Sequence, residues 1–240
     1  MSSFEDACRP VLFEEEHGAF PYWGKGSSFL IANSRAYYWV TASHVLSNLG
    51  GRAETLRIFP SDHSRISLPF NEQYVITRGA TDDEDYKDVF VLRVALDDFD
   101  RSGDAPLVAQ DIEQGALPAE NLVPGDELWL MGYPSESNFV DYDAQKIRNT
   151  RSVLRGVYQG HSISAHCHEL RVESSIQLES FDGLSGGPVF YMRSSVHEGR
   201  AVEFPMLVGM LLRGTSSSST AHFVSSTVLL GLIAKAENNA

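Results

Sequence analysis

Short runs of apolar residues, separated by turn residues, make up most of the chain. The clearest runs are residues 28–31, 37–41, 56–59, 74–77, 89–94, 128–131, 153–158, 169–173, 188–191 and 207–212. Their length and their bounding turn residues are typical of β-strands. Strands do not alternate regularly with helical segments, so the pattern favours barrels or sandwiches over a doubly wound sheet.

One stretch near the end of the chain has helical periodicity. Ser225 and Ser226 offer N-terminal caps, and the apolar residues that follow recur close to a 3.6-residue period. That face carries Val228, Leu229, Leu232, Ile233 and Ala236. The sequence therefore predicts an all-β body closed by a C-terminal helix over residues 225–237.

Composition supports a folded chain and excludes some partners. The 240 residues are 42% hydrophobic and only 21% charged, which is enough apolar material for a large core. With 19 Lys+Arg against 32 Asp+Glu, the formal net charge is −13, which argues against nucleic acid and against an anionic membrane surface as partners. The longest apolar runs, 206–212 and 228–234, are far shorter than the roughly 20 residues that span a bilayer.

The N-terminus and the cysteines favour a cytoplasmic location. The chain begins Met-Ser-Ser-Phe-Glu-Asp and soon reaches acidic residues at 14–16, unlike a secretory signal. Only Cys8 and Cys167 are present, and we expect two free thiols in a reducing compartment, although one disulfide remains open.

A glycine-flanked serine carries the strongest chemical signal. Residues 183–188 read Gly-Leu-Ser-Gly-Gly-Pro and lead directly into an apolar strand. Glycines on both sides of Ser185 let the backbone adopt positive φ and turn its N–H groups inward, as an oxyanion site requires. A simple tight turn, or the Gly-x-Ser-x-Gly elbow of an α/β-hydrolase, would give a similar pattern.

Two further segments supply possible partners for this serine. His44 directly follows an apolar strand and small residues, and a fixed imidazole is what a serine hydroxyl needs to become a nucleophile. Asp88 opens a strongly apolar strand, where its carboxylate can orient that imidazole. The neighbouring Asp82, Asp83 and Asp85 fit a solvated loop instead, and either of the two partners could also be purely structural.

The order of these residues along the chain separates the known arrangements. An α/β-hydrolase places its acid after the serine, but no aspartate follows Ser185. The subtilisin order requires an aspartate before the histidine, and Asp6 alone precedes His44, outside any predicted strand. The order His, Asp, Ser is that of chymotrypsin.

The chain resembles the trypsin-like serine proteases of the chymotrypsin fold, in particular the compact bacterial type related to glutamyl endopeptidases and Deg-type proteases. Four patches carry the resemblance: residues 26–44, 88–92, 132–134, and 183–190 followed by Val208-Gly-Met. The resemblance implies two six-stranded antiparallel Greek-key barrels with a C-terminal helix. It also implies Ser185 as nucleophile, His44 as general base, Asp88 as its orienter, and the N–H groups of Gly183 and Ser185 as oxyanion hole.

The domain organisation that the resemblance implies is a single peptidase unit over residues 1–240. Its first barrel covers approximately residues 20–100 and holds His44 and Asp88. A linker over 101–120 leads to the second barrel, 121–224, which holds Ser185, and the helix follows at 225–237.

Activation and specificity are less evident from the residues. Leu184 stands where the digestive and clotting enzymes have an aspartate that receives a new N-terminus, so we expect an enzyme that folds competent or is switched otherwise. By the resemblance, the substrate pocket lies near Glu179, Ser180, Arg213, Gly214 and His222. An inward Glu179 would select basic side chains, and an inward Arg213 or His222 would select acidic ones.

No metal or cofactor is expected. His161, His166, Cys167 and His168 are potential zinc ligands, but neighbours on a strand face opposite ways and cannot easily converge on one ion. The leading hypothesis is a serine endopeptidase acting on proteins or peptides. The alternatives are a catalytically silent trypsin-like module that binds peptides or partners, and, less favoured, an esterase. The oligomeric state stays open.

Overall fold

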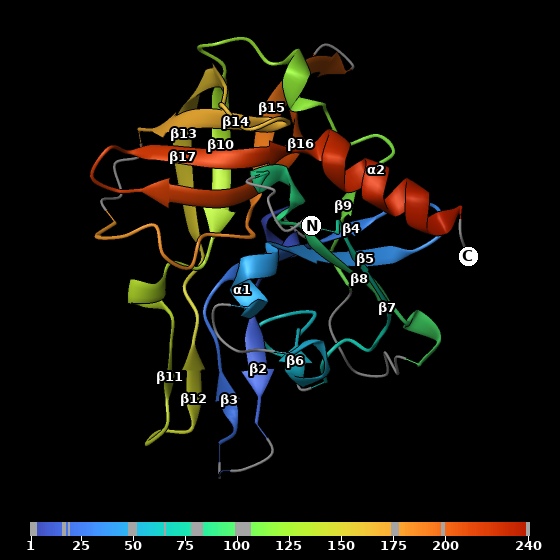
Figure 1. Ribbon diagram of the computed structural model, residues 1–240, viewed down its shortest axis with the longest axis vertical. Coiled ribbons are helices and arrows are strands. Elements are labelled where there is room, and N and C mark those ends of the chain that lie inside the picture. Colours follow the sequence, from blue (N-terminus) through green and yellow to red (C-terminus); the bar gives the residue numbers. More distant parts are fainter. Residues whose placement is uncertain are drawn as a thin grey trace.

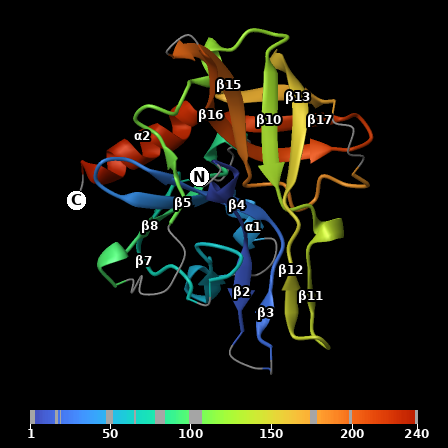
Figure 2. The ribbon, with the colours of Figure 1, turned by 180° about the vertical axis from the view of Figure 1, so that it is seen from behind.

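Strands dominate the computed structural model, and a single long helix follows them at the C-terminus (Figure 1). The structure describes residues 4–15, 18, 20–47, 52–64, 66–77, 84–98, 107–173, 178–197 and 200–238. The predicted all-β fold class with a C-terminal helix is confirmed. The chain folds into two β-units, which lie one above the other in Figures 1 and 2.

The second β-unit is a closed barrel of six antiparallel strands. Its strands follow one another around the barrel as β10 (Glu127–Gly132), β13 (Ser152–His161), β14 (Cys167–Val172), β17 (Thr220–Ser225), β16 (Arg200–Thr215) and β15 (Pro188–His197). Alternation creates its core: along β13, Leu154 and Tyr158 are buried while Arg155 and Gln159 face solvent. Leu128, Leu170 and Phe223 fill the interior beside them.

The first β-unit has six strands in a more open arrangement. Its hydrogen-bonded path is β1 (Cys8–Pro10), β4 (Ser27–Ala32), β5 (Tyr37–Thr41), β8 (Phe90–Val94) and β7 (Phe70–Val75), and β9 (Gln110–Asp111) pairs with β4. The β4–β9 pairing is parallel, so the expectation of a purely antiparallel sheet is wrong at this one edge. Trp39 is fully buried at its centre, against Phe70 and Phe90.

Two smaller sheets project from the same end of the molecule (Figures 1 and 2). One consists of β3 (Tyr22–Trp23), β2 (Leu12–Glu14) and β6 (Leu56–Arg57), and the other is the hairpin of β11 (Phe139–Asp141) and β12 (Lys146–Arg148). The Tyr142 hydroxyl donates to the carbonyl of Tyr22 and joins the two.

The helices are short except for the last. They are α1 (Ser43–Ser47) and α2 (Ser226–Glu237), with 3₁₀ turns η1 (Phe4–Ala7), η2 (Ala53–Thr55), η3 (Asp85–Lys87), η4 (Leu96–Asp98), η5 (Ala119–Asn121) and η6 (Ser135–Ser137). The Ser225 hydroxyl caps α2 by accepting from the Thr227 N–H, and Leu229 and Ile233 are buried beneath the helix. Within the described ranges, no helix is long and apolar enough to cross a membrane.

The structure moves two of the predicted boundaries. Residues 8–10 pair with β4, so the first unit begins before residue 20. Residues 110–111 form β9, so this part of the predicted linker 101–120 belongs to the first sheet, whereas Ala116 forms a bridge to Leu207 of the second barrel. Residues 99–106 lie outside the described part. Both strands are too short to show periodicity, and the long-range pairing that creates them is invisible in a local pattern.

Candidate active site

His44 and Asp88 come together at one edge of the first unit. His44 is the second residue of α1, which begins two residues after β5 ends, and Asp88 lies between η3 and β8. The Asp88 carboxylate accepts two hydrogen bonds from His44, one from the backbone N–H at 2.9 Å and one at Nδ1 at 2.5 Å. A carboxylate only accepts, so Nδ1 carries the proton and Nε2 is left as the free basic nitrogen.

Burial of the Asp88 carboxylate strengthens its interaction with His44, while the imidazole of His44 stays accessible to solvent. The Asp88 side chain is 12% exposed and that of His44 is 32% exposed. The carboxylate is therefore shielded while the imidazole reaches the cleft. This arrangement fixes the ring and can stabilise the imidazolium that forms when Nε2 takes up a proton.

Ser185 belongs to the other β-unit, on the loop before β15. Its neighbour Leu184 is fully buried in the core of the second barrel and anchors the loop there. Burial of the apolar Leu184 side chain thus holds the loop. In the enzymes that have an aspartate at this position, an ion pair holds it instead.

Two glycines let this loop make its turn. Gly183 has φ +89°, and a Cβ there would lie 2.4 Å from the Tyr133 carbonyl oxygen. Gly186 has φ +85°, and a Cβ there would lie 2.1 Å from the Ser27 carbonyl oxygen. Both positions therefore exclude larger residues by conformation and by space.

The N–H groups of Gly183 and Ser185 are available to a ligand, since neither has a hydrogen-bond partner among the described residues. Each belongs to a peptide plane whose carbonyl is held from the opposite side. The Asp182 carbonyl accepts from the Ser135 N–H at 2.8 Å, and the Leu184 carbonyl accepts from the Gly187 N–H at 3.0 Å. Two fixed, unpaired donors beside a serine are the features of an oxyanion hole.

His44 and Ser185 line one cavity of about 230 Å³ between the two units. Its other walls are Lys25, Gly26, Val45, Ser135, Asp182 and Gly183. In the part of the chain that the structure describes, Ser185 Oγ makes no hydrogen bond to His44. No sequence pattern pointed to Lys25, Ser135 or Asp182, because polar residues on loops carry no local signal of a shared cavity.

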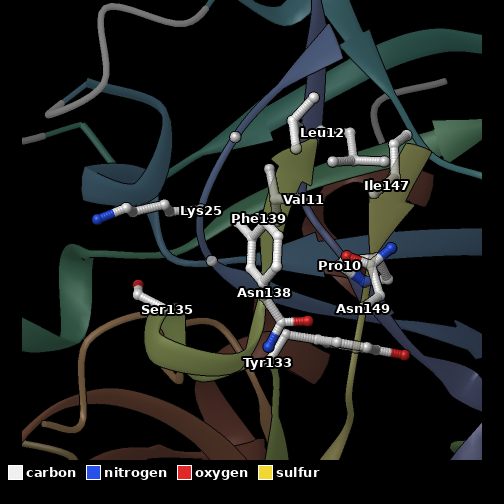
Figure 3. A pocket seen from close by; sticks show the side chains of 13 residues that line it. Pro10, Val11, Leu12, Lys25, Tyr133, Ser135, Asn138, Phe139, Ile147 and Asn149 are labelled. Atoms are coloured by element: carbon white, nitrogen blue, oxygen red, sulfur yellow. The ribbon is translucent and has the colours of Figure 1, made fainter. Parts of the chain in front are cut away.

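A second hollow adjoins this cavity and is almost filled. It shares Lys25, Gly26 and Ser135 with the first and has an open volume of only about 10 Å³. Figure 3 shows why: Phe139 from β11 and Ile147 from β12 point toward Val11 and Leu12. The open space beside Ser185 therefore ends at the paired smaller sheets.

The five residues predicted to form the substrate pocket lie elsewhere than the walls of this cavity. The Glu179 side chain is exposed, and the Ser180 hydroxyl accepts from the Asp182 N–H at 3.0 Å. Gly214 pairs with Ala221 in the barrel. They remain predictions for the specificity pocket.

The two basic side chains of the predicted pocket, Arg213 and His222, already have acidic neighbours. Arg213 forms an ion pair with Asp85 at 2.5 Å. His222 Nδ1 lies 3.7 Å from a Glu169 carboxylate oxygen. Arg213 is thus compensated by Asp85 of the other β-unit, and its charge is not free to attract an acidic side chain by itself.

The histidine-rich segment has a different environment. His166 Nδ1 and His168 Nε2 each lie 3.9 Å from Glu120 Oε1, while Cys167 is buried in the apolar core. Across the described ranges, no group of three His, Cys, Asp or Glu residues is arranged to hold a metal ion.

Two β-units, with a histidine–aspartate pair on one and a glycine-flanked serine on the other, define a protein of the chymotrypsin-like fold class. A family model for the trypsin-like peptidase domain matches residues 26–196, which is more than half of the chain. The chain therefore belongs to the trypsin-like peptidase domain family. No curated protein matches the chain.

Proposed function

We propose that this protein is a serine endopeptidase that cleaves proteins or peptides through an acyl-enzyme intermediate. The observation that carries the proposal is the pair of hydrogen bonds from His44 to Asp88, together with a shared cavity for His44 and Ser185. This arrangement leaves Nε2 of His44 as a base on the wall that Ser185 also lines.

The chemistry follows from these positions. Ser185 Oγ attacks the carbonyl carbon of the scissile bond as His44 Nε2 takes its proton, and the carbonyl oxygen gains negative charge that the N–H groups of Gly183 and Ser185 receive. The C–N bond then breaks, and His44 returns the proton to the leaving amine. Water, activated in the same way by His44, releases the acid and restores Ser185.

A fluorophosphonate probe tests this proposal directly. We expect covalent labelling of Ser185, located by peptide mapping, and loss of labelling in Ser185→Ala and His44→Ala. Hydrolysis of a mixed peptide library should fall by about 10⁴-fold or more in both variants, because triad residues act as a unit. Ser218→Ala, on the exposed turn before β17, is the matched serine control and should retain both signals. A folded wild-type protein that stays unlabelled would refute the proposal.

A catalytically silent binding module is the second candidate function. It is favoured by one observation: Ser185 Oγ makes no hydrogen bond to His44 within the described residues. Against it, catalytic hydrogen bonds are often long in the absence of substrate. The Gly183 N–H also points away from Ser135 and has no partner within the described part of the chain. A peptide that binds with unchanged affinity to wild type and Ser185→Ala, and is never cleaved, would support the silent module.

We also propose a reducing, cytoplasmic setting. Cys8 and Cys167 are free and buried, and burial raises the pKa of each thiol to about 12. Both therefore remain protonated and unreactive at neutral pH. Alkylation of the native protein without reductant should leave both thiols unmodified until it unfolds.

A further inference from the structure

Ser27 lies at the point where the first β-unit meets the loop that carries Ser185. It is the first residue of β4 and is fully buried. Its backbone N–H donates to the Ser185 carbonyl at 3.0 Å, and its hydroxyl donates to the Gly183 carbonyl at 2.6 Å. One residue of the first unit thus holds the carbonyls on both sides of Leu184 in the second.

The Ser27 hydroxyl acts both as a hydrogen-bond donor and as an acceptor. While donating to Gly183, it accepts from the Tyr133 N–H at 2.8 Å. Two residues after Tyr133 on the same segment, the Ser135 N–H donates to the Asp182 carbonyl. The hydroxyl therefore connects the loop with the segment that fixes it, and its orientation is determined by two partners.

These bonds determine the conformation of Gly183. The peptide plane before Gly183 is held through the Asp182 carbonyl. The plane after it is held at both ends, because the Gly183 carbonyl accepts from the Ser27 hydroxyl and the Leu184 N–H donates to the Phe181 carbonyl at 3.1 Å. Glycine alone has no conformational preference that would keep φ at +89°. Without the Ser27 hydroxyl, the second plane keeps only the bond of the Leu184 N–H, so the backbone at Gly183 is less restrained. A change of φ there can turn the Gly183 N–H away from the position where the oxyanion forms.

We propose that Ser27 is a positioning residue that keeps the Gly183 N–H directed at the reacting carbonyl. The inference rests on the proposed peptidase function, since it concerns the same site. Ser27 touches neither the cavity nor substrate, and it acts only through the Gly183–Ser185 loop.

The adjacent serine provides a matched control. Ser28 is also fully buried in β4, and its hydroxyl donates to the Arg9 carbonyl at 2.9 Å. Ser28→Ala therefore removes one buried hydroxyl and its hydrogen bond to a backbone carbonyl, but leaves the Ser185 loop untouched. Ser27→Ala removes such a bond and, in addition, the bond that the hydroxyl accepts from the Tyr133 N–H.

The experiment compares wild type, Ser27→Ala and Ser28→Ala in peptide hydrolysis, boronic-acid inhibition and urea unfolding. Loss of one direct oxyanion donor lowers kcat by about 10²–10³-fold, and an indirect loss should give about 10- to 100-fold. We expect Ser27→Ala to lower kcat and boronate affinity by similar factors with KM nearly unchanged. Ser28→Ala should keep wild-type kcat and lower the urea midpoint by less than Ser27→Ala does, because it removes one hydrogen bond and not two.

Several outcomes separate this inference from the function on which it rests. If wild type neither hydrolyses peptides nor binds the boronic acid, the proposed function fails. If wild type is active and both variants lose kcat equally, or neither does, Ser27 has only a structural role and the inference is wrong. Should Ser27→Ala fold poorly, Ser27→Cys takes its place: the thiol is a weaker donor than the hydroxyl, and kcat should again fall while KM is kept.

Discussion

His168 is a fully buried histidine in the second barrel, in an environment that opposes its charge. Its Nδ1 lies 2.7 Å from the Tyr158 hydroxyl and its ring stacks on Phe223. Its Nε2 has no hydrogen-bond partner among the residues that the structure describes. Burial lowers the pKa of His168 to about 4, and the nearby His161 and His166 add to this effect while Glu120 opposes it. The folded protein therefore holds this imidazole neutral.

This lowered pKa predicts acid sensitivity. The unfolded chain takes up a proton on His168 near pH 6.5, and the folded chain does so only near pH 4, so stability from this group is complete above pH 6.5 and is lost as the pH falls toward 4. The loss amounts to about 3 kcal/mol. Urea unfolding at pH 7, 6, 5 and 4 measures it.

The matched variants are His168→Gln, which keeps a polar partner for Tyr158, and His63→Gln on the exposed surface. We expect His168→Gln to be less stable at pH 7 but to lose less free energy of unfolding between pH 7 and pH 4 than wild type. His63→Gln should follow the wild-type curve. Equal pH dependence in wild type and His168→Gln would contradict the prediction.

At the scale of single residues, the order of the motifs identifies the candidate catalytic residues. It does not identify the residues that hold them in position. His44, Asp88 and Ser185 stand out because each adjoins a strand end or a glycine turn that is visible in sequence. The role of Ser27 depends on Gly183, 156 positions away, and the compensation of Arg213 depends on Asp85, 128 positions away. Such pairs arise only when the two units pack, so no local pattern contains them.

At the scale of elements, η3 is the connection that carries Asp88 to its place. This single turn belongs to the first unit but is held by the second. Asp85 pairs with Arg213 of β16 and accepts from the Ser164 hydroxyl at 3.2 Å, and Tyr86 packs edge-on against His166. The turn immediately before Asp88 is thus restrained from across the cleft.

Removing the cation should loosen this turn without unfolding the protein. Arg213 is 59% exposed, and an exposed ion pair contributes less than about 1 kcal/mol to stability. We therefore expect Arg213→Gln to change the free energy of unfolding by less than that amount. The amide protons of Lys87 and Asp88, which bond within the turn, should exchange several-fold faster.

Arg155→Gln is the control for this variant. Arg155 forms an ion pair with Glu127 at 3.3 Å on the outer surface of the second barrel, away from the turn. It should leave the exchange of Lys87 and Asp88 unchanged. Unaltered exchange in Arg213→Gln would mean that the turn is held well enough by its own hydrogen bonds, the Ser164 hydroxyl and the Tyr86 contact.

The elements also differ in how far the sequence predicts them. The C-terminal helix follows from an apolar face and a serine cap, and β13 and β16 contain the predicted strand runs 153–158 and 207–212. The hairpin β11–β12 lies in a polar, charged stretch that predicts a loop. Its three residue pairs are held by backbone pairing and by contacts with the neighbouring small sheet, which a local pattern does not contain.

At the scale of the whole molecule, the N-terminal segment joins the two units. Cys8–Pro10 pairs with β4 of the first unit, and the Cys8 carbonyl accepts from the buried Tyr133 hydroxyl at 3.1 Å. Phe4 packs edge-on against Phe190 of β15, with ring centroids 5.2 Å apart. Arg151, just before β13, donates to the Glu5 carbonyl and pairs with its carboxylate.

These contacts predict that the segment makes unfolding of the two units cooperative. Deletion of residues 1–7 removes the Phe4 packing and the Arg151 contacts but leaves β1 in place. A ring packed in this way contributes about 0.5–1.5 kcal/mol beyond its buried area, so we expect a lower urea midpoint for the truncated chain. We also expect the two units to unfold at different urea concentrations, since fewer contacts would bind them together.

Tryptophan positions make this separation measurable. Trp23 and Trp39 lie in β3 and β5, and Trp129 lies in β10 of the second barrel. In a Trp129→Phe background, fluorescence follows the first half of the fold while circular dichroism follows the whole. The two transitions should coincide for the full chain and diverge after the deletion. Val196→Ala, at an exposed site on β15, should leave them coincident. Coincident transitions in the truncated chain would show that the buried interface around Ser27 and Tyr133 is sufficient to couple the two units.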